Sequence, residues 1–323
     1  MSKVNDLPPP ETPPSGATSP PKPSDVTPLP PSVSNHTPSI QNLVAWAPLY
    51  LSKTDRVINH LSALLSSPSG TDRLLCTLGY TSLLTSTVAT SISQRQLHTR
   101  ARSIIEKAFA LPANTTVIIN ASELKIPGSR LLVAGKRLKA LNGLISDFRI
   151  FVRLWGLVGL WGWGKSVLLR IHKERNKGSP MEKDDESSDR VGTGIEAAQV
   201  LVNILYQFLE NGAYLSSKGV LGWNTEKQNW AWIWSSRFWM THVGLDFIRL
   251  AREWSKKGKD AEEQEKLIWK WRREMVVNAA YAPLTLHWSL EKGLVGDFWV
   301  GVFGSIAGLG GLREAWRVTG AGI

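Results

Sequence analysis

The stretch Arg130–Trp155 reads RLLVAGKRLKALNGLISDFRIFVRLW, and its pattern decides the fold class. Apolar residues recur at alternating spacings of three and four, which is the spacing of one face of an α-helix. This apolar stripe comprises Leu131, Ala134, Leu138, Leu141, Ile145, Phe148, Val152 and Trp155. The polar side is made of Lys136, Lys139, Asn142, Ser146, Arg149 and Arg153. The stretch is therefore predicted to be a basic amphipathic helix.

The same three-and-four spacing recurs along most of the chain, whereas strand-like alternation is never sustained. The one short β-like run is 117–119 (Val-Ile-Ile). Further helices are expected at 43–66, 71–93, 97–111, 195–218, 229–257, 261–291 and 295–317, and the helix that begins at 130 is expected to continue to 171. The predicted fold class is all-α.

Two polar segments divide the chain. Residues 1–40 hold 12 of the 18 prolines and few apolar residues, so this tail is predicted to be disordered. Residues 172–194 are charged and have no apolar stripe, which predicts a surface linker. The linker separates an N-terminal helical region, 41–171, from a C-terminal helical region, 195–323.

The composition narrows the class of partner. The net charge of +11 on 323 residues favours an anionic partner, either nucleic acid or an anionic lipid surface. Many of the 15 tryptophans lie at 223–271, in apolar helical patterns without the strands on which nucleic-acid bases usually stack. We therefore expect a lipid partner and no nucleic acid.

Cys76 is the only cysteine, which excludes an intramolecular disulfide and suits a small core residue.

One motif suggests nucleotide chemistry. Residues 159–166 (GLWGWGKS) match the phosphate-binding pattern G-x-x-x-x-G-K-[ST], in which Lys165 and Ser166 would contact phosphate and magnesium. The pattern requires a preceding strand, but a helix is expected there, and Trp161 and Trp163 would crowd the loop. Nucleotide binding is kept as the weakest alternative. The six histidines stand singly, no G-x-S-x-G motif occurs, and no two carboxylates are placed for acid–base chemistry. We therefore predict no enzyme, no catalytic residues, no metal site and no cofactor.

The C-terminal region comes close to the length of a membrane span. Residues 294–312 are apolar except for Asp297, and Gly304 and Gly308 have the spacing that lets two helices approach closely. We expect 275–290 and 294–312 to anchor the chain in a membrane, and the two glycines to support self-association. The alternative is a buried glycine-rich hairpin of a soluble domain.

The basic amphipathic helix suits a position flat in a lipid interface. The residues expected to bind the membrane are Leu131, Lys136, Leu138, Lys139, Leu141, Ile145, Phe148, Arg149, Val152, Arg153 and Trp155. The alternative is a core-facing helix whose outer face is basic. A second alternative function is a solute channel, for which the Ser/Thr-rich 74–94 is the one indication.

Four stretches together resemble the peroxisomal biogenesis factor 11 (peroxin-11) family in a divergent form. They are Ser69–Tyr80, Leu138–Arg149 with the following Leu154–Gly156, Leu205–Gly219 (LYQFLENGAYLSSKG), and Pro283–Leu290 with the glycine-rich tail. The likeness covers about residues 43–320, and it depends on the order and spacing of the stretches.

The resemblance implies an α-helical protein of the peroxisomal membrane. Such a protein elongates the membrane, promotes peroxisome proliferation, forms homo-oligomers and recruits the fission machinery, including a dynamin-related GTPase. The resemblance supplies no catalytic residues. The Pro-rich 1–40 and the insertion at 172–194 depart from the family pattern, so they leave open which role of the family this chain has.

Overall fold

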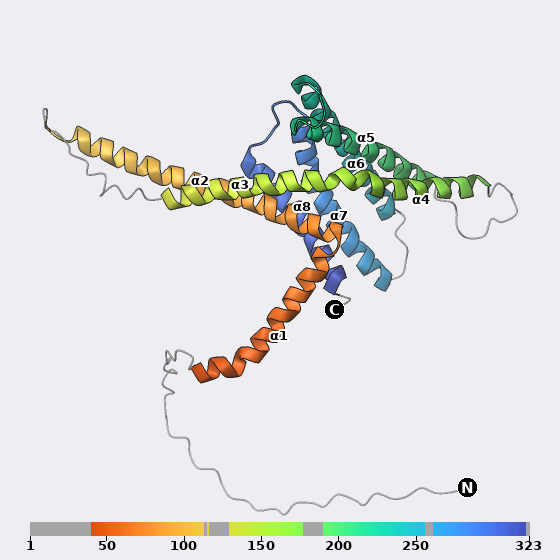
Figure 1. The fold of residues 1–323 in the computed structure, drawn as a ribbon, viewed down its shortest axis with the longest axis horizontal. Helices are drawn as coiled ribbons and strands as arrows, with labels where there is room; N and C mark the ends of the chain where they lie inside the picture. Colours follow the sequence, from red (N-terminus) through yellow and green to blue (C-terminus); the bar gives the residue numbers. More distant parts are fainter. Residues whose placement is uncertain (1–39, 113–114, 116–128, 177–189, 256–260, 321–323) are drawn as a thin grey trace, which may run out of the picture. The chain divides into compact units, whose positions relative to one another are not determined.

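The structure is a computed structural model, and it describes residues 40–112, 115, 129–176, 190–255 and 261–320. The regular elements in these ranges are helical (Figure 1), as the sequence predicts. In chain order they are α1 (Ile40–Leu65), α2 (Pro68–Phe109), α3 (Ser129–Val152), the 3-10 turn η1 (Arg153–Trp155), α4 (Gly156–Asn176), α5 (Arg190–Ser217), α6 (Thr225–Ser255), α7 (Ala261–Trp288) and α8 (Asp297–Gly320).

The chain forms two units, Met1–Lys53 and Thr54–Ile323. The described part of the first unit is the beginning of α1. The second unit contains the end of α1 and all the other described helices. The tail 1–39, the β-like run 117–119 and most of the linker at 177–189 lie outside the described residues.

Several helix boundaries differ from the predicted ones. The two helices expected at 71–93 and 97–111 form the single helix α2, because no glycine or proline separates them. The start of α2 is fixed by Ser67, whose side chain accepts a hydrogen bond from the amide of Gly70 at 3.0 Å, with Pro68 in the first turn. Conversely, the helix expected at 130–171 is interrupted by η1 and extends to Asn176.

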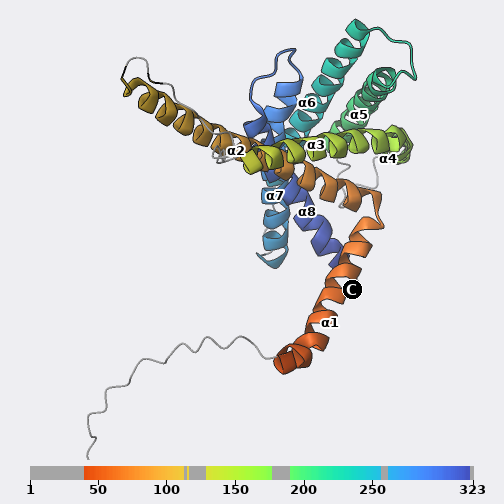
Figure 2. The same ribbon diagram turned by 60° about the vertical axis from the view of Figure 1, so that its left-hand side comes forward.

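The helices of the second unit pack as a closed ring. Helix α2 packs between α3 and α8, α8 packs on α7, α7 on α6, and α6 on α5. The ring closes where α5 contacts α4, η1 and α3. Figures 1 and 2 show α2 and α3 packed together and crossing at an angle, with α8 on the other side of α2.

Small residues bring α2 close to both neighbours. The hydroxyl of Ser86 donates a hydrogen bond to the carbonyl of Gly135 on α3 at 2.7 Å. A Cβ atom added at Gly301 of α8 would lie 2.9 Å from the Leu84 backbone. The Ser/Thr-rich stretch at 74–94 therefore includes positions that pack helix against helix.

Polar side chains take much of the interior, while large apolar side chains lie outside. Buried polar residues include Gln199, Gln207, Glu210 and Asn211 of α5 and Asn278 of α7. Each of the eight described α-helices carries at least one exposed large apolar side chain. The surface of the helix ring is thus unusually apolar, and its interior is unusually polar.

The described helices include none that is both long and apolar enough to cross a membrane. The stretch 294–312, expected to be a near-span, begins in the turn before α8 and ends inside it. In α8, Val300 and Ala307 are buried, and Val300 joins the core cluster with Leu83 and Leu284. This part of α8 belongs to the helix ring.

Candidate functional site

An exposed apolar ridge runs along α3, η1 and α4. Its members recur at spacings of three and four, so they lie on one side of the nearly continuous helix. Exposure is highest at Leu144, Val158 and Trp161, with 69%, 72% and 75% of their surface accessible. We call this surface the α3–α4 ridge and define it as Leu141, Leu144, Phe148, Phe151, Trp155, Val158 and Trp161.

Exposed basic residues continue the same spacing beyond both ends of the ridge. Arg137 lies four residues before Leu141, and Lys165 lies four residues after Trp161. The 21 residues from Leu141 to Trp161 would extend about 30 Å as a regular helix. The result is a long apolar surface with a cation at each end.

The sequence placed only part of this surface correctly. Leu141, Phe148, Val152 and Trp155 are exposed. Leu131 and Leu138 are half-buried, and Ile145 is buried. The predicted apolar stripe is therefore split between the surface and the core.

The predicted basic side is divided in the same way. Lys136 is exposed, and Lys139 is exposed but forms an ion pair with Asp297 at 2.6 Å. Arg149 and Arg153 turn inward, so they do not belong to the exposed side of α3. Arg149 of α3 and Arg153 of η1 therefore lie on the side that packs on the other helices.

Each inward arginine binds a carboxylate on another helix. Arg149 donates to Asp72 of α2 at 2.8 and 3.2 Å, and Arg153 donates to Glu210 of α5 through two bonds of 2.9 Å. Burial alone would lower the pKa of both arginines. Asp72 raises the pKa of Arg149 above its ordinary value, and Tyr206 together with Glu210 raises the pKa of Arg153. These forked pairs fix the rotation of α3 and thereby turn the ridge outward.

Four ridge residues were missed in the sequence, namely Leu144, Phe151, Val158 and Trp161. The signal was present, because the three-and-four spacing from Leu141 continues through Trp155 into the Gly/Trp-rich segment.

That segment also contains the P-loop-like match. Residues 159–166 lie inside α4, where the backbone amides take part in the hydrogen bonding of the helix. The Ser166 hydroxyl donates to the Trp163 carbonyl at 2.7 Å. They do not form a phosphate-binding loop.

The two glycines expected to support self-association are buried within the chain. A Cβ atom at Gly304 would overlap the ring of Tyr80 on α2, and one at Gly308 would lie 3.0 Å from the Cα of Thr77. Their close-packing surface is thus occupied by α2 of the same molecule. A second copy would have to contact other residues.

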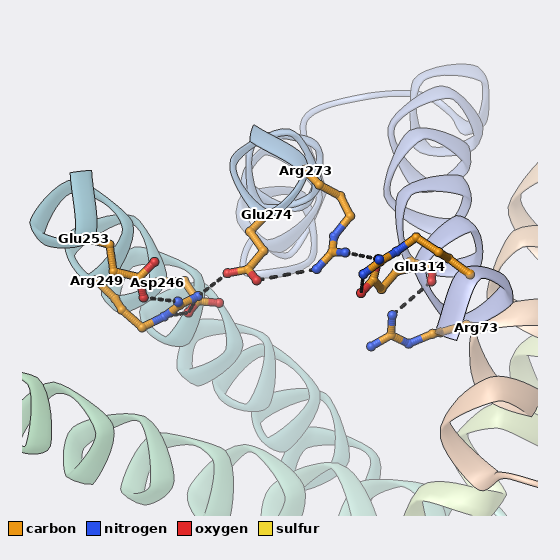
Figure 3. A network of polar contacts seen from close by, with 9 residues as sticks. Arg73, Asp246, Arg249, Glu253, Arg273, Glu274 and Glu314 are labelled. Atoms are coloured by element: carbon orange, nitrogen blue, oxygen red, sulfur yellow. Dashed lines mark hydrogen bonds and ion pairs between the residues drawn. The ribbon is translucent and has the colours of Figure 1, made fainter. Parts of the chain in front are cut away.

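A series of ion pairs joins the ring helices on the side of α6, α7 and α8 (Figure 3). Arg249 on α6 binds Glu274 on α7 at 2.9 Å, and it also binds two carboxylates of its own helix. Arg273 on α7 pairs with Glu314 on α8. Arg73 on α2 donates to a backbone oxygen of α8 at 2.9 Å. Charged contacts therefore link four consecutive helices of the ring.

Hollows lie inside the ring. One of about 520 Å³ lies between α2, α6, α7 and α8, and a second of about 260 Å³ lies between α3, α5, α6 and α7. Both are lined by Trp239 and Tyr281. Among the buried polar residues, Glu210 of α5 and Ser235 of α6 line the smaller hollow, and Asn278 of α7 lines the larger one.

Comparisons with known proteins place the chain in a family. No protein-family model matches the chain, and no solved structure matches it. It is 30% identical over 177 residues to "Uncharacterized protein C1F12.04c" of the fission yeast Schizosaccharomyces pombe. The alignment covers 55% of this chain and 72% of the yeast protein. The chain belongs to the family of this fission-yeast protein.

Proposed function

We propose that the chain is a peripheral membrane protein that lies on an anionic lipid surface through the α3–α4 ridge. The observation that carries this proposal is the ridge itself, a row of exposed aromatic and aliphatic side chains about 30 Å long with a basic residue beyond each end. Such a surface is costly in water, but it suits the boundary between lipid headgroups and acyl chains. Tryptophan favours that boundary in particular.

The energetic terms favour apolar burial over charge. A large apolar side chain contributes roughly 1.5–3 kcal/mol when fully buried, and less in a wet headgroup region. A basic residue near an anionic surface adds about 1 kcal/mol. With seven ridge residues and two flanking cations, apolar burial should dominate the affinity and the cations should set the preference for anionic lipid.

The resemblance to the peroxin-11 family suggests which membrane this is. We place the chain on the peroxisomal membrane, where the ridge would wedge into one leaflet and favour curvature. Elongation of the membrane, peroxisome proliferation and fission by a dynamin-related GTPase would follow from this curvature. Self-association would use exposed surfaces, since α2 covers Gly304 and Gly308.

Vesicle flotation tests the proposed contact. Trp155→Ser removes the burial of one ridge aromatic, about 2 kcal/mol, so binding to vesicles of phosphatidylcholine and phosphatidylserine should weaken about 30-fold. The matched control is Trp230→Ser on α6, where the tryptophan is 51% exposed but lies outside the ridge. This control should bind as the parent does.

A second pair of measurements completes the test. Replacing Arg137 and Lys165 with glutamine should weaken binding to anionic vesicles and leave binding to neutral vesicles unchanged. In cells, a fluorescent fusion should outline peroxisomes, and the Trp155→Ser fusion should be diffuse. If both tryptophan variants bind vesicles equally well, the ridge is not the membrane contact and the proposal is wrong.

A further inference from the structure

The smaller hollow has two walls of different chemistry. Its volume is about 260 Å³, below the ~300–1,000 Å³ that is usual for drug-sized ligands, so it suits a compact group. Helices α6 and α7 supply an aromatic wall, and α3 with η1 supplies a guanidinium wall. No step of the proposed membrane contact uses this hollow.

Trp239 is the centre of the aromatic wall. Its ring stacks on Trp288 with 5.6 Å between centroids and lies 5.4 Å from the ring of Tyr281. The ring of Tyr206, from α5, stacks on Trp239 at 6.2 Å. All four rings line the hollow. Where a ring face is open to the hollow it attracts cations, and quaternary ammonium groups in particular.

Arg149 and Arg153 form the other wall. They lie one helical turn apart, and both line the hollow. Each is bound by one carboxylate, and the Glu210 side chain also accepts a hydrogen bond from the Tyr206 hydroxyl at 3.1 Å. Guanidinium groups recognise phosphate through their planar arrangement of donors.

The balance of charge identifies the ligand class. The two guanidinium groups are matched by the carboxylates of Asp72 and Glu210, so the hollow carries little net charge. A simple anion would leave the aromatic wall unused, and a simple cation would leave the guanidinium wall unused. A zwitterion whose positive and negative groups are separated by a short spacer satisfies both walls.

We propose that this hollow binds a phosphocholine group, with its phosphate on Arg149 and Arg153 and its trimethylammonium group against Trp239, Trp288 and Tyr281. The larger hollow shares Trp239 and Tyr281 with the smaller one. The group can come from free phosphocholine or from a phosphatidylcholine headgroup. The proposal stands apart from the α3–α4 ridge, because the soluble group needs no membrane.

Isothermal titration calorimetry of the full-length chain tests the site. Phosphocholine should bind at least tenfold more tightly than choline or inorganic phosphate, because only phosphocholine uses both walls. Arg153→Lys keeps the charge but has a single donor nitrogen, which cannot bind Glu210 as a fork and also offer further donors to a phosphate, so it should weaken phosphocholine and phosphate and spare choline. Trp239→Leu should weaken phosphocholine and choline and spare phosphate. Trp269→Leu, exposed on α7 and outside the hollow, is the control and should bind phosphocholine as the parent does.

The two wall variants keep the test decisive if one of them fails to fold, which circular dichroism would reveal. The proposal is overturned if millimolar phosphocholine gives no binding, or if it binds no tighter than phosphate. It is also overturned if a folded wall variant binds like the control.

A short-chain phosphatidylcholine below its micelle concentration distinguishes the two sources of the phosphocholine group. Tighter binding of this lipid than of free phosphocholine, retained in Trp155→Ser, indicates the headgroup, and equal or weaker binding indicates the free compound.

Discussion

At the residue scale, Arg149 and Arg153 show how a charged side chain can be misplaced by periodicity. Both fall on the polar side of an ideal helix, and their charge predicts solvent exposure. In the structure, the Arg149 side chain is 15% exposed, because Asp72 of α2 compensates its charge. The partner lies 77 residues away, so no local pattern could indicate the pair.

The pair of Arg153 with Glu210 has a measurable role in stability. Glu210→Leu should lower the free energy of unfolding by about 2–4 kcal/mol, because it leaves a largely buried guanidinium group without its carboxylate. Replacing both residues, Arg153→Met with Glu210→Leu, should recover most of that loss. Urea denaturation provides the measurement. Glu106→Leu, in the exposed pair with Arg102, is the control and should change stability by less than about 1 kcal/mol. Equal losses in the single and double variants would contradict this role of the pair.

His242 should make stability depend on pH. Burial lowers its pKa below the ordinary 6.5, Asp246 raises it partly back, and Arg249 lowers it again. As the pH falls through 6.5, the unfolded chain therefore binds a proton that the folded protein does not bind. The stability contributed by neutral His242 is present above that pH and is lost below it.

The test compares unfolding free energies at pH 7.5 and 5.5, values that bracket the ordinary histidine pKa of about 6.5. The parent should lose more stability over this interval than His242→Gln, whose side chain retains an acceptor for the 2.9 Å contact with Asn203. The same comparison at exposed His98 serves as the control. An identical pH dependence in the parent and His242→Gln would rule out this contribution.

At the scale of elements, the sequence predicted the helices better than it predicted their faces. Spacing located most helices to within a few residues, because 3.6-residue periodicity is a local property. It assigned the faces of α3 poorly, since apolar residues such as Leu132, Leu144 and Ile150 lie around most of that helix. Which of them reaches the surface depends on α2 and α5, and their positions are not encoded within α3.

Glycines on α8 and α4 have opposite expected effects. Gly304→Val should destabilise the fold by several kcal/mol, on the order of 3, because any side chain at this position meets the ring of Tyr80. Gly159→Ala on α4 is the matched comparison, since a Cβ atom there has no neighbour within 4 Å. It should raise stability by about 1 kcal/mol through helix propensity. Thermal unfolding followed by circular dichroism should give shifts of opposite sign, and a stabilising shift for Gly304→Val would contradict the described α2–α8 contact.

At the scale of the whole second unit, the ring arrangement explains why polar residues lie inside. Helices that pack around shared hollows present side chains to spaces that hydrogen-bonding groups can occupy. The ion pairs from α6 to α8 and the forked pairs of Arg149 on α3 and Arg153 on η1 join neighbouring helices to one another. The apolar residues that such a fold leaves outside become available for lipid or for other proteins.

The contact between α2 and α8 has a consequence for biosynthesis. Helix α2 emerges from the ribosome early, but its packing partner α8 ends at Gly320, more than 200 residues later. At about 5–20 residues per second, α2 waits roughly 10–45 s for that partner. During this interval its contact surface, including Tyr80 and Leu84, is uncovered. Chaperones are therefore expected to bind the nascent chain until α8 has left the ribosome.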